Sequence, residues 1–101
     1  MSTPLLGKES ALHELCARHR VKRLDIIGSA ATGQFDPAAS DLDFLVTFQE
    51  MPPREHANAY LGLIEDMEAL FALHIDLVEE QAISNPVFLE NVRKQRVPVY
   101  G

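Results

Sequence analysis

The chain is poor in cysteine, has no tryptophan and lacks any long hydrophobic run. Because Cys16 is its single cysteine, an internal disulfide is excluded, and we expect a reducing, cytoplasmic location. No stretch is long enough to cross a bilayer, and the N-terminus shows no signal-peptide pattern. We therefore expect no membrane partner.

Basic residues are also in short supply. Nine Lys and Arg residues stand against 15 Asp and Glu residues, which gives a net charge of −6 at pH 7. A general nucleic-acid-binding protein normally presents a basic stripe, so we expect no direct binding of nucleic acid. An acidic surface is compatible with a basic protein partner.

The length and the pattern of the sequence favour one small folded unit. A chain of 101 residues, 47% hydrophobic and 24% charged, predicts a single globular domain over residues 1–101. Helical periodicity covers about residues 4–20, 54–73 and 86–96, and short apolar runs predict strands at about 21–27, 41–48, 75–78 and 97–100. This alternation predicts an α/β (α+β) fold, with a small mixed sheet covered by helices.

Several details of these elements can be predicted locally. A Ser2 or Thr3 cap before Pro4 should open the first helix, and Asn85 before Pro86 should open the last. The second helix should pack on the sheet through apolar residues at helical spacing, and in the last helix Phe88 should belong to the apolar side. The helix 54–73 contributes Ala57, Tyr60, Leu61, Ile64, Met67, Leu70 and Phe71 to this set.

The most informative stretch is Ser40-Asp41-Leu42-Asp43, which opens the second strand. Side chains at positions i and i+2 of a strand share a face, so Asp41 and Asp43 should stand side by side while Leu42 faces the core. Two neighbouring carboxylates repel each other unless a cation or a shared proton lies between them. Oxygen ligands at this spacing suit a hard divalent ion, and magnesium fits best.

A turn with phosphate-binding chemistry, Gly28-Ser29, precedes this strand. Gly28 permits a tight turn and a close approach of the backbone to a ligand. Backbone N–H groups and the Ser29 hydroxyl suit a phosphate, particularly at a helix N-terminus, although a plain turn would use the same residues. Metal and phosphate chemistry therefore converge on one place.

A third carboxylate lies inside the next predicted strand, His74-Ile75-Asp76-Leu77-Val78. An aspartate in such an apolar strand is costly unless it is paired, hydrogen-bonded or bound to a metal. We therefore predict a functional role for Asp76. Glu79 and Glu80, at the end of the strand, are weaker alternatives.

Together, Gly28-Ser29, Asp41-Leu42-Asp43 and Asp76 resemble the signature of the DNA polymerase β-like nucleotidyltransferase superfamily. The short chain resembles the minimal nucleotidyltransferases (MNT), whose relatives include antitoxins paired with HEPN-domain toxins. The resemblance covers roughly residues 21–79, and the ending Val97-Pro98-Val99-Tyr100 also looks like this group. It implies the nucleotidyltransferase fold.

The resemblance also implies a reaction, in which AMP passes from ATP, or from another NTP, to an acceptor hydroxyl and pyrophosphate is released. Asp41, Asp43 and Asp76 would be the catalytic residues and would hold two Mg²⁺ ions, for which Mn²⁺ could substitute. The nucleotide would be bound by a second set of residues. These are Gly28, Ser29, Thr32 and Ser40.

The sequence departs from the family pattern at one point. Many members carry an arginine after the Gly-Ser turn, where Ala30 and Thr32 stand here. Arginine would clamp a phosphate, so its absence should weaken triphosphate binding unless Lys22, Arg23, a C-terminal basic residue or a partner chain compensates.

Three functions follow from the resemblance. The first is an antitoxin of a type VII-like toxin–antitoxin pair, which attaches AMP to a hydroxyl, such as a tyrosine, of a HEPN-type toxin. The second is a binding-type antitoxin that masks its partner without catalysis. The third is a nucleotidyltransferase acting on a small molecule such as an antibiotic, for which 101 residues leave little room.

Overall fold

The computed structural model describes residues 5, 7–33 and 41–101. The predicted cap at Ser2 or Thr3 and the predicted site residue Ser40 lie outside these residues. Across the described part of the chain, no helix combines the length and the apolar character needed to span a membrane.

The order of elements agrees with the order predicted from the sequence. The elements are α1 (Glu9–Arg18), β1 (Val21–Ile27), α2 (Gly28–Thr32), β2 (Leu42–Phe48), α3 (Pro53–Phe71), β3 (Ile75–Glu79), the 3-10 helix η2 (Glu80–Ala82), α4 (Pro86–Gln95) and β4 (Val97–Tyr100). The first helix begins later than predicted, because Gly7 takes a left-handed conformation with φ 80° just before it. The Asn85 side chain caps α4 as predicted, accepting hydrogen bonds from the N–H groups of Val87 and Phe88.

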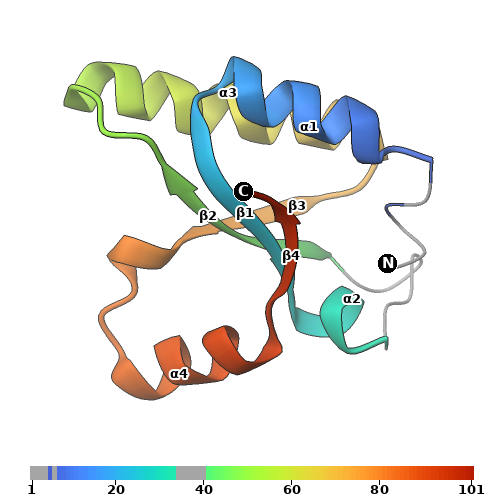
Figure 1. The fold of residues 1–101 in the computed structure, drawn as a ribbon, viewed down its shortest axis with the longest axis vertical. Helices are drawn as coiled ribbons and strands as arrows, with labels where there is room; N and C mark the ends of the chain where they lie inside the picture. Colours follow the sequence, from blue (N-terminus) through green and yellow to red (C-terminus); the bar gives the residue numbers. More distant parts are fainter. Residues whose placement is uncertain (1–4, 6, 34–40) are drawn as a thin grey trace.

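The four strands form one mixed sheet in the order β3-β2-β1-β4 (Figure 1). Strand β1 is antiparallel to both β2 and β4, whereas β2 and β3 run parallel. The predicted edge position of β4, which contains Pro98, is confirmed. Strand β3 forms the other edge.

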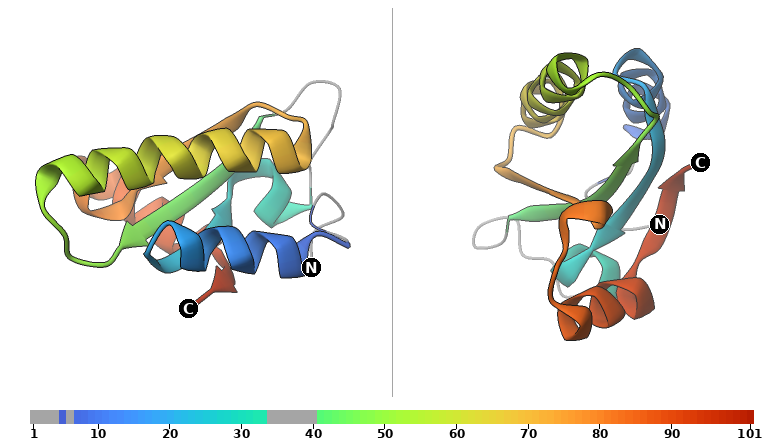
Figure 2. Two further views of the ribbon diagram at one scale, coloured as in Figure 1. Left: turned by 90° about the horizontal axis from the view of Figure 1, so that it is seen from above. Right: turned by 90° about the vertical axis from the view of Figure 1, so that its left-hand side faces the viewer.

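Helices α1 and α3 lie on one face of the sheet and α4 on the other (Figure 2). The main core lies under α1 and α3 and includes Leu42, Phe44 and Val46, the alternate residues of β2 that were predicted to face inward. A smaller cluster of Ile27, Leu45 and Val92 lies under α4. The face of β2 that carries Leu45 also carries Asp43, because the two residues are two positions apart.

Cys16 is fully buried in the main core. Burial raises the pKa of its thiol to about 12, so the thiol stays protonated and inert at neutral pH.

The apolar face of α3 agrees with the prediction only in part. Met67 and Phe71 are buried, and Tyr60, Ile64 and Leu70 pack against the main core. Leu61 is 59% exposed and Ala57 is exposed, whereas the buried residues are Ala59, Leu63, Met67 and Phe71. These four recur every fourth residue, and Leu61 lies about 200° around the helix from Ala59. Phe88 in α4 is likewise 45% exposed, because Val92 is the residue of that helix that reaches the sheet.

Side chains of α3 bond the backbone of the edge strand β3. The Tyr60 hydroxyl donates a hydrogen bond to the carbonyl oxygen of Leu77 at 2.6 Å. The N–H of Ile75 donates to Oε2 of Glu68 at 3.3 Å. The helix is therefore joined to β3 by polar contacts as well as by apolar packing.

Candidate functional site

The strand register places two of the predicted carboxylates next to each other. Asp43 of β2 lies opposite Asp76 of β3 in the parallel pair, and opposite Ile27 of β1 in the antiparallel pair. Directly opposed residues of neighbouring strands share a face. Asp41 immediately precedes β2 and is exposed. The three aspartates thus gather where β2 and β3 begin and β1 ends.

The electrostatics of Asp43 reflect this gathering. Partial burial raises the pKa of Asp43, and the negative charges of Asp76 and Asp41 raise it further, while His74 counteracts part of the shift. The three carboxylates are therefore within electrostatic reach of one another, and Asp43 is the one whose ionisation is disfavoured.

Gly28 lies in close contact with Asp43, whereas the close approach to a ligand stays a prediction. Its φ is 70°, in the left-handed region that favours glycine. A Cβ added at this position would lie 2.5 Å from Oδ2 of Asp43, so a side chain here would collide with the carboxylate. The glycine fixes the distance between the turn and the acidic pair.

The short helix α2 carries the other predicted nucleotide-binding residues. Ser29 is half-buried in its first turn, whereas Thr32 is exposed. The Thr32 hydroxyl is directed back to its own helix, where the carbonyl oxygens of Gly28 and Ser29 lie at 3.4 and 3.3 Å. Gly33 ends α2 in a left-handed conformation.

The two positions that lack the usual arginine have different surroundings. Ala30 is 4% exposed and belongs to the main core, whereas Thr32 faces solvent. Of the two, position 32 alone can present a side chain to a ligand without disturbing the core.

The burial argument for Asp76 is wrong. Its neighbours Ile75 and Leu77 are buried, but Asp76 itself is exposed. The reason is that β3 is an edge strand whose inner face packs under α3, while its opposite face is open at this end. The position of Asp76 beside Asp43 now supports its role, rather than a cost of burial.

The two alternatives to Asp76 have other partners. Glu79 forms a hydrogen bond with the Nε2 of His56, a histidine for which the sequence suggested no context. Glu80 binds Arg93 and Arg96, each at 3.1 Å.

The donor set suits a hard divalent ion. No three His, Cys, Asp or Glu side chains of the described residues already surround a common point that could hold a metal ion. Carboxylate oxygens are nevertheless the ligands that Mg²⁺ prefers. Burial and the two neighbouring carboxylates raise the pKa of Asp43, and a cation bound between these carboxylates would offset their repulsion.

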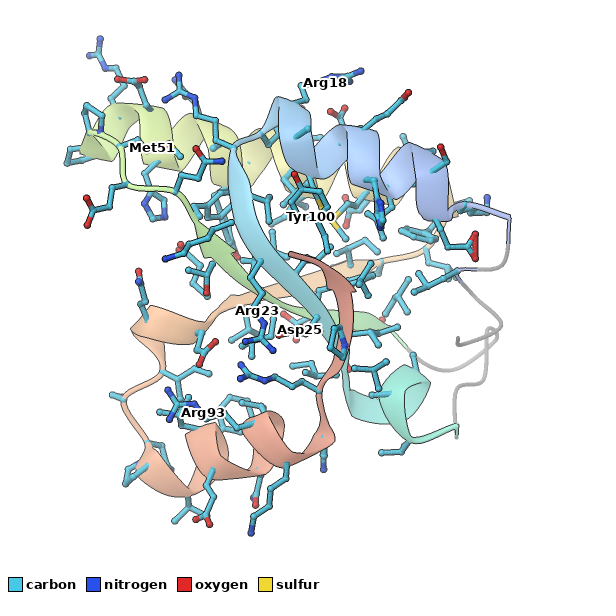
Figure 3. All side chains as sticks on the ribbon, in the orientation of Figure 1. Arg18, Arg23, Asp25, Met51, Arg93 and Tyr100 are labelled. Atoms are coloured by element: carbon cyan, nitrogen blue, oxygen red, sulfur yellow. The ribbon has the colours of Figure 1, made fainter. Side chains whose placement is uncertain are left out.

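A buried charge cluster on the same face of the sheet was missed by sequence reasoning. Asp25 of β1 is 1% exposed. The Nε of Arg23 lies 3.0 Å from its Oδ2 but donates its hydrogen bond to Oδ1 at 3.3 Å, which leaves Oδ2 without a hydrogen bond. Arg96 approaches the same oxygen at 3.8 Å and binds Glu80. Figure 3 shows Arg23 and Asp25 beside β1, with Arg93 on α4 below.

The cluster around Asp25 involves the cations that were expected to replace the arginine missing after the Gly-Ser turn. Arg23 and Arg96 are two of the cations proposed to replace it, and both are already matched by buried or half-buried carboxylates. The sequence did carry a signal for the first pair, because Arg23 and Asp25 are two positions apart on a strand.

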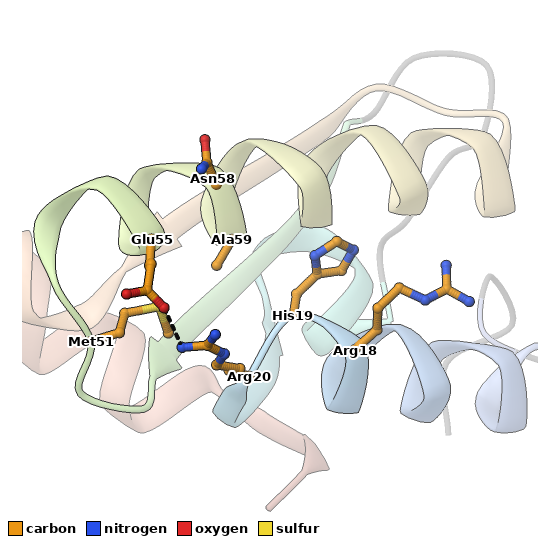
Figure 4. Close-up of a pocket in the computed structure, with 7 residues that line it drawn as sticks. All are labelled: Arg18, His19, Arg20, Met51, Glu55, Asn58 and Ala59. Atoms are coloured by element: carbon orange, nitrogen blue, oxygen red, sulfur yellow. Dashed lines mark ion pairs between the residues drawn. The ribbon is translucent and has the colours of Figure 1, made fainter.

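A recess of about 270 Å³ lies at the end of the sheet opposite to the three aspartates (Figure 4). In it Arg20 pairs with Glu55 at 2.9 Å. The Nε2 of His19 lies 2.7 Å from Oδ2 of Asp66, and this hydrogen bond lowers the pKa of Asp66. The charges of this recess are matched internally, so the acidic cluster remains the candidate site.

Asp41 and Asp43, at the start of β2 in a small mixed sheet, lie beside the Gly28-Ser29 turn. This is the arrangement of a nucleotidyltransferase. The sequence pattern of the family described as "Nucleotidyltransferase domain" matches residues 8–99, and the chain belongs to this family. No curated protein matches the chain.

Solved structures agree with this assignment. A minimal nucleotidyltransferase is 35% identical, with 93% of this chain and 91% of that chain covered and a TM-score of 0.71. A toxin–antitoxin structure with AMP-PNP is 19% identical, with coverage of 93% and 73% and a TM-score of 0.72. A tri-AMPylated HEPN toxin of Shewanella oneidensis in complex with its MNT antitoxin is 17% identical, with coverage of 92% and 69% and a TM-score of 0.64. The last two likenesses concern the fold.

Proposed function

We propose that this chain is a single minimal nucleotidyltransferase domain that transfers AMP from ATP to a hydroxyl of a HEPN-type toxin and thereby silences it. A tyrosine is the acceptor we favour, and the pair would act in the cytoplasm. The observation that carries the proposal is the pairing of Asp43 with Asp76 on adjacent strands, beside Gly28 and within reach of Asp41.

The three aspartates would hold two Mg²⁺ ions, or Mn²⁺ in their place. Such ions neutralise the triphosphate and lower the pKa of an attacking hydroxyl. Asp43 stands at the centre of the set and would contribute to both sites, with Asp41 on one side and Asp76 on the other.

The chain's own groups would bind and orient the reactants. The backbone of Gly28-Ser29 and the Ser29 hydroxyl would bind the phosphates, with Thr32 and Ser40 nearby in the sequence. The acceptor oxygen would attack the α-phosphorus, the bond to the β-phosphate oxygen would break, and pyrophosphate would leave with that electron pair. Asp76, which is open to solvent, would complete the second metal site or take the hydroxyl proton.

The experiment is to incubate the chain with the HEPN-domain protein of the same genome, Mg²⁺ and ATP labelled at the α- or the γ-phosphate. We expect label from the α-phosphate alone to enter the partner, with an added mass of one AMP. Asp43→Asn should abolish the transfer.

A non-catalytic antitoxin is the second candidate, and one observation favours it. No arginine follows the Gly-Ser turn, and Arg23 and Arg96 are already paired with carboxylates. In that case the partner would be bound and silenced without gaining mass.

A further inference from the structure

An apolar groove of about 300 Å³ lies between the end of β3 and the start of α4. Its apolar walls are Val78, Ala82, Ile83 and Phe88, which we call the β3–α4 groove. Phe88 is 45% exposed, and its neighbour Val87 is 65% exposed. Two adjacent large apolar side chains on one exposed helical turn, beside a recess, are typical of a binding surface.

The β3–α4 groove lies next to the candidate active site along β3. Val78 follows Asp76 by two positions on β3, so the two side chains share a face and lie about 6.6 Å apart along the strand. Val78 packs against the cluster that includes Leu45, on the face of the sheet that carries Asp43. A segment with its hydroxyl at the aspartates could therefore place a side chain two or three residues away in the groove.

The charges around the groove indicate what kind of segment fits. Asp41 and Asp76 are exposed, and neither forms an ion pair with a described residue. The nearby cations Arg93 and Arg96 are matched by Glu80. Even with two Mg²⁺ ions bound, the three carboxylates and a triphosphate together would carry more negative charge than the ions neutralise. The unmatched charge is thus negative, which favours a segment with lysine or arginine and disfavours nucleic acid.

We propose that the β3–α4 groove is the docking site of the acceptor protein. It takes a large apolar side chain from a basic segment of that protein, whose hydroxyl then lies at Asp43 and Asp76. The inference rests on the proposed function, because the occupant is the HEPN-domain protein that receives AMP. Docking through the groove would let this domain select its acceptor protein.

The first test measures the affinity of the HEPN-domain protein by calorimetry. Phe88 belongs to neither core cluster, so Phe88→Ser should fold. We expect it to weaken binding on the order of tenfold, as loss of an aromatic anchor does, and Phe88→Leu to restore most of the affinity. Leu61→Ser removes an apolar side chain of α3 that is more exposed than Phe88, at 59%, and should have no effect. Wild-type affinity in Phe88→Ser, or an equal loss in Leu61→Ser, would overturn the proposal.

A second pair of variants tests the charge of the occupant. Ala82 is exposed in the groove, and Ala82→Lys and Ala82→Glu add side chains of similar length and opposite charge. We expect Ala82→Lys to weaken binding several-fold more than Ala82→Glu. The reverse order would exclude a basic segment.

Failure of the docking proposal and failure of the proposed function give different results. If the wild-type chain binds through Phe88 but the partner gains no AMP, the transfer is wrong and the docking site stands. If AMP is transferred and Phe88→Ser changes neither the Kd nor the KM for the partner, the transfer stands and the docking site is wrong.

Discussion

Gly28 and Asp43 lie so close together that the Asp43 carboxylate can keep its position only because residue 28 has no side chain. A Cβ at residue 28 would stand 2.5 Å from Oδ2 of Asp43 and 3.3 Å from its Cγ. Because the backbone at Gly28 is also left-handed, with φ 70°, both the space and the conformation at this position call for glycine.

Gly28→Ala should therefore impair the site more than the fold. We expect destabilisation of about 1–3 kcal/mol from the left-handed backbone and the contact, together with displacement of the Asp43 carboxylate. Thermal unfolding and calorimetric titration with Mn²⁺ measure the two effects. Gly33→Ala is the control, because φ is 80° there but nothing lies within 4 Å of the added Cβ. Equal loss of Mn²⁺ binding in both variants would contradict the relationship.

Asp43→Asn should make the metal-free chain slightly more stable at neutral pH. The folded pKa of Asp43 lies above its usual value of 3.8, so its charge costs stability as the pH rises through the raised value. Below 3.8 the cost disappears. We expect a rise in Tm on the order of 2 °C at pH 7 and none at pH 3, since the carboxyl is partly solvated. The same variant should lose Mn²⁺ binding. Retained binding would remove Asp43 from the metal site.

Asp76→Ala should reduce turnover by about two orders of magnitude or more, with a smaller effect on nucleotide affinity. The reason is that a carboxylate serving the attacking hydroxyl acts chiefly in the transition state. Glu79→Ala, whose side chain is bonded to His56, is the comparison and should remain active. An active Asp76→Ala beside an inactive Glu79→Ala would assign the third carboxylate to Glu79.

Thr32→Arg should tighten ATP binding by one to two decades, because a charge-assisted contact to phosphate is worth roughly 1.5–3 kcal/mol. Position 32 is exposed, so the new side chain disturbs no packing. Ala30→Arg should instead unfold the chain, since it buries a charge in the main core. An ATP affinity unchanged in Thr32→Arg would mean that the triphosphate lies elsewhere.

Asp25→Ala should destabilise the chain by about 3 kcal/mol, because it leaves Arg23 and Arg96 partly buried without their shared carboxylate. Glu90→Ala removes a carboxylate from the exposed pair with Lys94 and should cost well under 1 kcal/mol. Urea denaturation compares the two. Equal values would mean that the buried cluster is no more stabilising than a surface pair.

The parts of the fold that could be predicted depend on local chemistry. The alternation of Leu42 and Phe44 with Asp43 requires no knowledge of the rest of the chain, and Gly28 and Asn85 mark a turn and a cap by themselves. Local patterns were therefore enough to predict where the strands lie and that Asp41 and Asp43 are close to each other.

The parts that could not be predicted depend on which surfaces meet. Leu61 and Phe88 have the right residue type for a core, but the helices turn other residues toward the sheet. The openness of Asp76 follows from the strand order, which places β3 at an edge. The cluster around Asp25 joins β1 to Arg96 at the end of α4, 71 residues after Asp25 in the chain.

The hydrogen bonds that Tyr60 and Glu68 of α3 form with the backbone of β3 affect whether copies of this chain can associate through their sheets. A border strand with free N–H and C=O groups is a template on which a strand of another chain can add. Here α3 occupies the carbonyl of Leu77 and the N–H of Ile75, and at the opposite border Pro98 offers no N–H. Both borders of the sheet are thereby poor templates, so crowding many copies together should not lead to growth of one sheet across molecules.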